Sequence, residues 1–453
     1  MKKGGGVRLS TTHVILLSFL GAILVGTLLL LLPFSSVGEG SASFTEALFT
    51  ATTATCVTGL VVVPTATAWS FFGQLVILLL IQIGGLGIIT VTSAIAVFMH
   101  RRMGLSDRLL LQDAFNLNHF SELGAFVKRV VLGTLLVEGL GAALYMTVLV
   151  PIYGARGIWM SVFNAVSAFC NAGMDVIGEN SLGDFAAHPL INTVTCGLII
   201  LGGLGYVVWW DVLRVRRESG QKKGSALARL TLHSKIVLAS TAILTLGGAV
   251  LIYLAEMNNP ATIGGRPFLD GVQIALFQSV TARTAGFATV PQESLTNATA
   301  VIMMLLMFIG GSPVGTAGGV KTVTFAVLLS AALSAVRNRR SVNLFGRQLS
   351  PDAVRKSIGV VLSSFAIFFC STLALSMVTD AALVDLLYET VSATATVGLS
   401  RALTPALNTA GRLIVAATMY FGRVGPISLA VAFGSKKENQ NIIQDPTEEV
   451  SVG

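Results

Sequence analysis

Long apolar segments alternate with short polar ones along the whole chain. A helix needs about 20 apolar residues to cross the hydrocarbon core of a bilayer, and eight segments have about that length or more. The pattern predicts membrane-spanning helices at residues 14–32, 71–99, 126–150, 189–210, 235–254, 299–336, 357–378 and 411–434. An even number of spans would place both termini on the same side of the membrane.

Composition and charge agree with a multi-pass membrane protein and predict its orientation. The 453 residues are 53% hydrophobic and 11% charged, against about 25% charged in a soluble domain. Twenty-three Lys or Arg fall in the segments 1–13, 100–129, 211–235, 337–356 and 435–453, whereas the loops on the other side carry four. This positive-inside bias predicts that both termini are cytoplasmic. It also explains the basic excess, so we expect no nucleic-acid partner.

The four outer loops share an internal repeat. Each holds a short half-span that ends in a similar phrase: FTATTATCVTGL (49–60), FNAVSAFCNAGM (163–174), FQSVTARTAGF (277–287) and YETVSATATVGL (388–399). When they are aligned on Gly59, Gly173, Gly286 and Gly398, the phrases recur every 112 to 114 residues. The repeat predicts four tandem units of span, half-span and span, with boundaries at 1–105, 106–218, 219–340 and 341–453.

A second glycine-rich phrase has the same period. Its copies are GGLG (84–87), GGLG (202–205), GGSPVG (310–315) and GRVG (422–425), which begin 24 to 29 residues after the aligned glycines. Glycines in a membrane helix usually permit close helix packing. Four copies in register predict equivalent units around one axis. The expected fold is an all-α membrane protein with eight transmembrane helices and four re-entrant pore loops around a pseudo-fourfold central pore.

The half-spans, at about 10–12 residues, are too short to cross the bilayer. Each would return outward as non-helical backbone, which is tolerated at membrane depth only beside a water-filled path. Four extended legs could present carbonyl oxygens that replace the hydration shell of a monovalent cation, and glycine permits the backbone angles required. We therefore predict a selectivity filter whose binding residues are Val57, Thr58, Gly59, Asn171, Ala172, Gly173, Thr284, Ala285, Gly286, Thr396, Val397 and Gly398. The alternative is four re-entrant packing helices with glycine turns.

The third inner helix is unusually long and unusually rich in helix breakers. Residues 298–336 would form a helix of about 58 Å, almost twice the ~30 Å hydrocarbon thickness. Its middle, GGSPVGTAGGVKT (310–322), has five glycines and one proline, which weaken and interrupt a helix. We predict two helices joined by an intramembrane loop that contains Gly310, Gly311, Ser312, Pro313, Gly315, Thr316, Gly318, Gly319 and Lys321. The alternative is a packing kink; a nucleotide P-loop does not fit, because no strand precedes these residues and Lys does not follow a glycine.

Three isolated charged residues near these phrases each allow two interpretations. Arg423, inside the last span, is either neutralised by backbone carbonyls or snorkelling, or faces a polar path beside the pore, where it would repel a cation. Asp175, two residues after Gly173, either concentrates cations at the pore mouth or is a solvated loop carboxylate. Arg283 is expected to brace its loop rather than to contact the ion.

Two other classes of function fit the sequence less well. A secondary transporter with inverted repeats would bind its substrate at broken helices, but all four repeats here share one orientation. A membrane-embedded enzyme would need a nucleophile or a metal cluster. The five histidines are scattered at span edges and loops without ligand spacing, so we expect no catalytic residue and no protein-bound metal apart from the transported ion.

Taken together, these phrases resemble those of the Trk/Ktr/HKT superfamily of potassium transporters. The resemblance rests on the four degenerate filter phrases, on QIGGLGI in the first inner helix and on GGSPVGTAGGVKT in the third, and it covers roughly residues 10–435. The eight spans, without extra N-terminal ones, are most similar to the KtrB type, the membrane subunit of bacterial Ktr systems. Only the first glycine of a potassium channel's TVGYG loop is retained in each copy. The resemblance therefore implies a preference for potassium that is less strict than a channel's.

The resemblance also implies a mechanism and partners. It implies potassium uptake across the bacterial cytoplasmic membrane, with the 310–322 loop and Arg423 as a gate beneath the filter. It further implies a homodimer in the lipid bilayer, a cytosolic KtrA-like ring subunit that binds ATP or ADP, and a dependence on sodium. No organic cofactor is expected in this chain. The alternatives are a TrkH-type or less selective K⁺/Na⁺ transporter, or an ion-coupled secondary transporter.

Overall fold

The computed structural model describes residues 11–38, 42–87, 90, 91, 93, 94, 123–218, 226–339 and 341–425. The expected cytoplasmic tail 435–453, the end of the expected last span (426–434) and most of the basic segment 100–129 lie outside these residues. The elements are α1 (Thr11–Leu30), α2 (Phe44–Cys56), α3 (Thr65–Ala68), α4 (Phe71–Leu86), α7 (Leu123–Tyr153), α8 (Ala155–Cys170), η1 (Gly183–Phe185), α9 (Pro189–Leu204), α10 (Tyr206–Arg217), α11 (Ala226–Arg229), α12 (Leu232–Glu256), α13 (Phe268–Thr281), η3 (Gln292–Ser294), α14 (Asn297–Phe308), α15 (Thr322–Val336), β1 (Asn343–Leu344), β2 (Arg347–Gln348), α16 (Pro351–Ser376), α17 (Leu383–Ala395), α18 (Leu403–Ala406) and α19 (Thr409–Val424).

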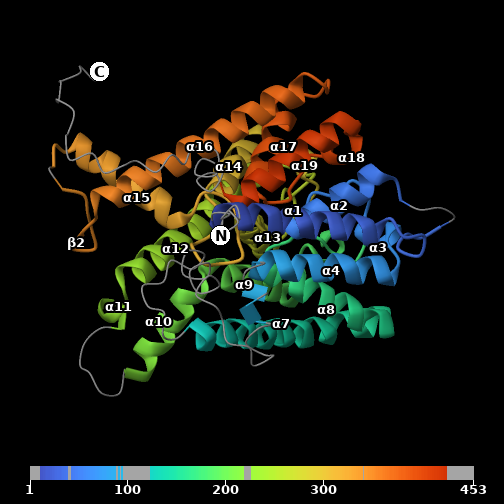
Figure 1. The fold of residues 1–453 in the computed structure, drawn as a ribbon, viewed down its shortest axis with the longest axis horizontal. Coiled ribbons are helices and arrows are strands. Elements are labelled where there is room, and N and C mark those ends of the chain that lie inside the picture. Colours follow the sequence, from blue (N-terminus) through green and yellow to red (C-terminus); the bar gives the residue numbers. More distant parts are fainter. Residues whose placement is uncertain are drawn as a thin grey trace, which may run out of the picture.

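The same order of helices occurs four times. A long outer helix, a short helix and an inner helix recur as α1–α2–α4, α7–α8–α9, α12–α13–α14 and α16–α17–α19. In each set the outer helix packs on its short helix, and the inner helix also contacts the short helix of the next set: α4 with α8, α9 with α13, α14 with α17, and α19 with α2. The last contact closes a ring, and Figure 1 shows the blue N-terminal helices beside the red C-terminal ones.

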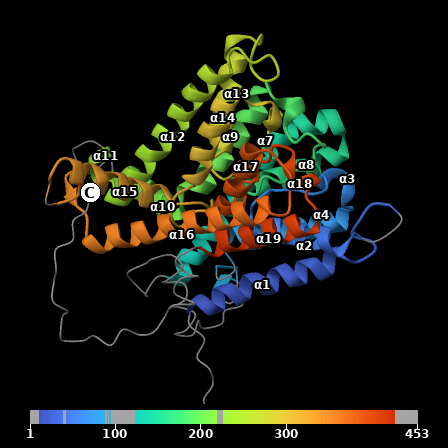
Figure 2. The ribbon, with the colours of Figure 1, turned by 90° about the horizontal axis from the view of Figure 1, so that it is seen from above.

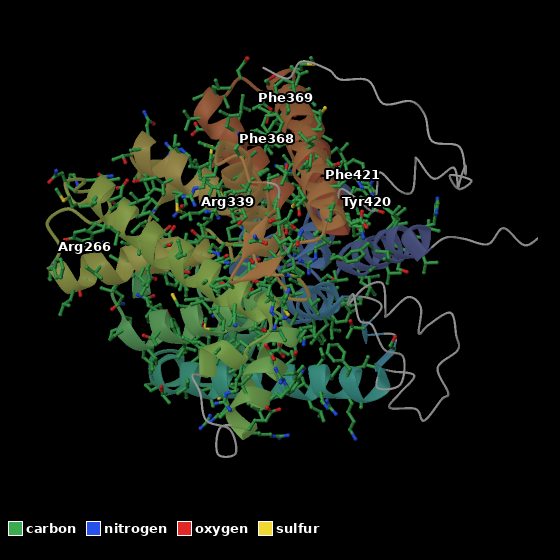
Figure 3. All side chains as sticks on the ribbon, turned by 90° about the vertical axis from the view of Figure 1, so that its left-hand side faces the viewer. Arg266, Arg339, Phe368, Phe369, Tyr420 and Phe421 are labelled. Carbon is green, nitrogen blue, oxygen red and sulfur yellow. The ribbon has the colours of Figure 1, made fainter. Side chains whose placement is uncertain are left out.

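The outer helices are the clearest candidates for membrane spans. Among the described residues, four helices are individually long and apolar enough to cross a membrane: His13–Leu30, Gly124–Tyr153, Leu232–Glu256 and Pro351–Ser376. They coincide with the expected spans 14–32, 126–150, 235–254 and 357–378. Each exposes large apolar side chains, and Figure 3 shows Phe369 among the aromatic side chains of α16. A hydrophobic outer surface of this kind is what lipid requires.

Three inner helices are followed directly by a glycine with positive φ. Within the expected spans 71–99, 189–210 and 411–434, α4, α9 and α19 end at Leu86, Leu204 and Val424. The next residue in each case is the last glycine of the glycine-rich phrase, with φ of 83° at Gly87, 86° at Gly205 and 96° at Gly425. After Gly205 the chain continues as α10, bent 95° from α9. The phrases predicted close packing and four equivalent units, but not that their last glycine adopts a positive φ that interrupts the straight helix.

The first glycine of the same phrase does serve packing. A Cβ placed on Gly84 would overlap the carbonyl oxygen of Thr55, the penultimate residue of α2. The same relation holds between Gly202 and Phe169 of α8 and between Gly422 and Thr394 of α17. These three inner helices, α4, α9 and α19, therefore lie against the C-terminal ends of the short helices of their own sets. This contact holds the short helices at a fixed depth between the longer ones.

The third inner helix is interrupted where its glycines and proline predict. α14 ends at Phe308, α15 begins at Thr322, and residues 309–321 form a loop. Beyond the loop, α15 and α16 are joined by the β1–β2 hairpin, whose central residues Phe345 and Gly346 have φ of 49° and 73°. Positive φ at both central residues is the requirement of a tight two-residue hairpin turn. Figure 2 shows α15 and the start of α16 on the left, at the same end of the molecule as α10 and α11.

Candidate functional site

The short helices end in a way that turns the chain sharply at the centre of the molecule. The residue after the last helical one is left-handed in three sets, with φ of 55° at Val57, 60° at Asn171 and 52° at Thr396. In each of these sets the next amide donates back to a carbonyl five residues earlier, at 2.8 Å, as in a Schellman motif. In the third set the left-handed residue is Thr284, three residues after α13 ends.

The segments that follow meet in a closed ring around the four aligned glycines. A Cβ placed on Gly59 would lie 2.5 Å from the carbonyl oxygen of Ala172. The same distance separates a Cβ on Gly173 from Ala285 O and one on Gly286 from Val397 O, and a Cβ on Gly398 would lie even closer to Thr58 O. Each glycine thus faces a carbonyl of the next segment, and the fourth faces the first. The twelve residues predicted from the four phrases are therefore brought together.

The carbonyl groups of the ring accept no hydrogen bond from the part of the chain that the structure describes. Among the described residues, no hydrogen bond ends on the carbonyl oxygens of the two residues that precede each glycine: Val57, Thr58, Asn171, Ala172, Thr284, Ala285, Thr396 and Val397. These residues are buried, at 1% exposure or less. Buried carbonyl groups are almost always paired with protein, water or a ligand. A ring of unpaired carbonyls therefore has the chemistry of a cation-binding site.

One hydroxyl group in each set braces the segment beside its glycine. Thr53 Oγ1 and Ser392 Oγ accept from the amides of Gly59 and Gly398, both at 3.0 Å. In the other two sets the hydroxyl donates instead, Ser167 Oγ to Met174 O at 2.5 Å and Thr281 Oγ1 to Phe287 O at 2.7 Å. Sequence reasoning missed this role. The signal was the Ser/Thr-Ala pair that follows the aromatic residue in every phrase.

A cavity of about 650 Å³ lies over the ring. All four glycines line it, and so do the carboxylates of Asp175, Glu179, Asp184 and Glu293, with Arg266 as the basic member of this lining. Asp175 Oδ1 accepts from the amide of Ile177 at 3.2 Å, and burial raises the pKa of Asp175 to about 6. Asp175 is therefore half-buried and holds its own loop, unlike a solvated loop carboxylate. It also lines the cavity, and its role in concentrating cations there stays a prediction.

The 309–321 loop lies against two of the ring segments. Thr316 Oγ1 donates to Phe169 O at 2.9 Å, at the end of α8, and Gly318 packs on the side chain of Thr396. The amides of Ser312 and Thr316 donate to Gly203 O and Gly202 O, at 2.9 and 3.1 Å. The loop is closed on itself by bonds from Gly310 N to Val320 O, Gly311 N to Gly318 O, and Lys321 Nζ to Ala317 O. Pro313 and Gly315 complete its tip, next to Gly205 and Gly202.

Two arginines hold this loop through backbone carbonyls. Arg423 donates to Thr316 O and to Gly84 O, both at 2.7 Å. Backbone carbonyls therefore hold the guanidinium of Arg423, and one of them belongs to the loop, whereas its repulsion of a cation in the pore stays a prediction. Arg283, 7% exposed, donates to Gly310 O at 3.3 Å and approaches Thr245 Oγ1 at 3.5 Å. Arg283 therefore braces the start of the 309–321 loop, and it is covalently adjacent to the third ring segment.

Comparisons with known proteins agree with one another over nearly the whole chain. The family model of the TrkH cation transport proteins matches residues 7–444. Ktr system potassium uptake protein B of Bacillus subtilis is 36% identical over 448 residues, which is 99% of this chain and 98% of that protein. The potassium/sodium uptake protein NtpJ of Enterococcus hirae is 36% identical over 430 residues, with 94% and 93% coverage. The crystal structure of the potassium transporter TrkH from Vibrio parahaemolyticus covers 95% of this chain and 86% of its own, with a TM-score of 0.74 at 16% identity.

Proposed function

The chain belongs to the TrkH family of cation transport proteins, and from this premise we propose that it takes up potassium through the ring at Gly59, Gly173, Gly286 and Gly398. It is a multi-pass membrane protein and a transporter, not an enzyme. The observation that carries the proposal is the closed ring of unpaired, buried carbonyl groups under a cavity rich in carboxylates. The potassium uptake proteins among its relatives support potassium as the substrate.

The carbonyl groups of the ring would select potassium over sodium. A monovalent cation that leaves the cavity loses part of its hydration shell, and the carbonyl oxygens that precede the four glycines replace it. The cost of dehydration is lower for potassium than for the smaller, more strongly hydrated sodium ion. Because the phrases differ between the sets and keep a single glycine each, we expect moderate rather than strict selectivity. The potassium/sodium uptake protein among the relatives favours a less selective K⁺/Na⁺ transporter as the second candidate.

The 309–321 loop would act as a gate beneath the ring. Its contacts with the ends of α8 and α17 put it against two of the four filter segments. A cation that passes the filter must then pass the loop and the guanidinium of Arg423. At roughly 8 Å and an effective dielectric constant near 20, that charge repels a monovalent cation by about 2 kcal/mol. The gate thus restricts flux without binding the ion.

Growth of a bacterium that lacks its own potassium uptake systems tests the proposed function. We expect this chain, produced with a cytosolic partner of the KtrA type, to restore growth in medium poor in potassium. The strain with an empty vector is the control, and rubidium uptake into the same cells reports transport directly. Failure to restore either growth or rubidium uptake, with the chain present in the membrane, would contradict the proposal.

The resemblance to KtrB-type subunits extends the proposal to partners. We propose a homodimer in the bacterial cytoplasmic membrane, with both termini in the cytoplasm, regulated by a cytosolic ring subunit that binds ATP or ADP and dependent on sodium. Basic residues at the ends of the helices support a cytoplasmic docking face, among them Arg214, Arg216 and Arg217 of α10. The α15–α16 hairpin adds further basic residues to this end of the molecule.

Cross-linking in native membranes tests the proposed assembly. With the ring subunit co-expressed, we expect cross-linked dimers of this chain that co-purify with the ring. The chain expressed alone serves as the control and should give dimers without the ring. Recovery of monomers only, under conditions in which the ring subunit itself is assembled, would count against the proposed partners and leave the transport function untouched.

A further inference from the structure

A buried carboxylate that the proposed pathway does not use lies behind the side chains that line the cavity over the ring, which are called the wall of this cavity below. Glu389, on α17, is 0% exposed. Among the described residues no basic side chain forms an ion pair with it. The nearby Arg401 is already engaged, since its Nε bonds Asp385 at 2.8 Å and its terminal nitrogens bond backbone carbonyls around η3. A fully buried acidic side chain without a cation is costly and calls for an explanation.

Two hydroxyl groups connect Glu389 to the cavity. Ser400 Oγ donates to Glu389 Oε2 at 2.6 Å, and Thr404 Oγ1 donates to Glu389 Oε1. Ser400 Oγ itself accepts from the amides of Leu403 and Thr404, both at 3.2 Å. Its own proton is therefore committed to Glu389, whose Oε2 must act as an acceptor. Ser400 and Thr404 both line the cavity over the ring, so the carboxylate lies one side chain behind that surface.

The acidic side chain is peculiar to the fourth set. In every set a polar residue follows the buried aromatic residue of the short helix: Thr50, Asn164, Gln278 and Glu389 in turn. The surroundings of Gln278 are the most similar to those of Glu389, because Gln278 Nε2 donates to Thr289 Oγ1 at 3.1 Å and Thr289 also lines the cavity. The first three side chains cannot carry a negative charge, so the fourth set alone has an acidic group at this position. Among these four positions, only Glu389 can place a formal charge behind the wall.

We propose that Glu389 is an affinity-determining residue for the transported cation, acting through the field of its buried charge on an ion at the outer end of the filter. The proposal rests on the proposed function, since it requires a cation at the ring. Glu389 cannot ligate that cation, because Ser400 and Thr404 stand between them. A charge behind a protein wall acts through a medium of low dielectric constant and is screened little by water or salt. The exposed carboxylates of Glu179, Asp184 and Glu293 in the cavity lack this advantage.

The variant Glu389→Gln isolates the charge. Glutamine can still accept from Ser400 through its oxygen and donate to Thr404 through its amide, so the wall is retained while the charge is lost. We expect the KM of rubidium uptake to rise about fivefold, which corresponds to about 1 kcal/mol, with Vmax and the amount of folded protein near those of the unaltered chain. If Glu389 only held the wall, Vmax or protein yield would change and KM would not.

The matched variant Gln278→Glu adds a charge at the equivalent position of the third set. We expect Gln278→Glu alone to lower KM, and in combination with Glu389→Gln to restore it in large part. An unchanged KM in Glu389→Gln, alongside lost selectivity in Gly398→Ser, would overturn this inference and leave the proposed function standing. Unchanged selectivity in the serine variants of all four aligned glycines would instead overturn the filter itself. If Glu389→Gln does not fold, an unchanged KM in Gln278→Glu alone overturns the inference.

Discussion

Serine at Gly59, Gly173, Gly286 or Gly398 is expected to lower the preference for potassium over sodium about tenfold or more, which corresponds to at least about 1.4 kcal/mol. At these four positions φ lies between 66° and 98°, a region that side chains disfavour. The added Cβ would also press on the carbonyl group of the neighbouring segment. Both effects move the carbonyl oxygens that would hold the ion, so selectivity should fail before folding does.

The loss of selectivity should be largest where the added Cβ comes closest to a carbonyl oxygen. The shortest approach is that of a Cβ on Gly398 to Thr58 O, so Gly398→Ser should be the most affected of the four. The control is Gly247→Ser, on the exposed side of α12, where an added Cβ meets nothing within 4 Å. Competition of sodium with rubidium for uptake gives the selectivity of each variant, and surface labelling gives the amount of protein. Unaltered selectivity in all four variants would show that the ring does not select the ion.

Deletion of residues 312–317 is expected to raise flux about tenfold or more and to make it independent of the cytosolic regulator. The deletion removes Thr316 and its bonds to α8 and Arg423. Gly311 N already donates to Gly318 O at 3.3 Å, so the cut ends lie side by side and can be joined with little distortion. The filter segments are left intact, and the preference for potassium should therefore stay near its normal value.

A smaller change in the same direction is expected for Arg423→Ala. It removes the repulsion of about 2 kcal/mol, at most about thirtyfold in rate, and loosens the loop without removing it. The competing interpretation, in which the glycines of this segment serve only close helix packing, predicts the opposite result of poor assembly and little flux. Uptake rate, selectivity and surface expression must be measured together. A deletion variant that assembles well with unchanged or lower flux would rule out the gate.

The features that recur four times could be predicted from the sequence. Four phrases with a common period place the glycines without any structure, and the breakers in 310–322 predict the interruption between α14 and α15. The repeat boundaries and the role of each filter and gate residue stay predictions. Hydropathy also predicted the positions of the four outer helices. A lipid-facing helix is constrained mainly by its length and its apolar composition, and both can be read from the sequence.

What could not be predicted depends on contacts between distant segments. The bend after Gly205 occurs where Tyr206 N meets Val314 O, a contact with a loop more than a hundred residues away. The carbonyl groups that hold Arg423 come from two other sets. Glu389 looks like any polar member of its phrase until its burial and its bond to Ser400 are known. In each case hydropathy and spacing give the position of the residue in the repeat. Its contacts are made with residues far away in the sequence, which neither pattern identifies.

The position of a bound ion would show whether the carbonyl ring holds the transported cation. Anomalous diffraction from crystals of the protein grown in rubidium would locate the ion without any kinetic measurement. We expect a peak on the axis of the ring, between the carbonyl oxygens of Thr58, Ala172, Ala285 and Val397. Ions elsewhere in the protein and none at the ring, in a preparation that transports rubidium, would contradict it.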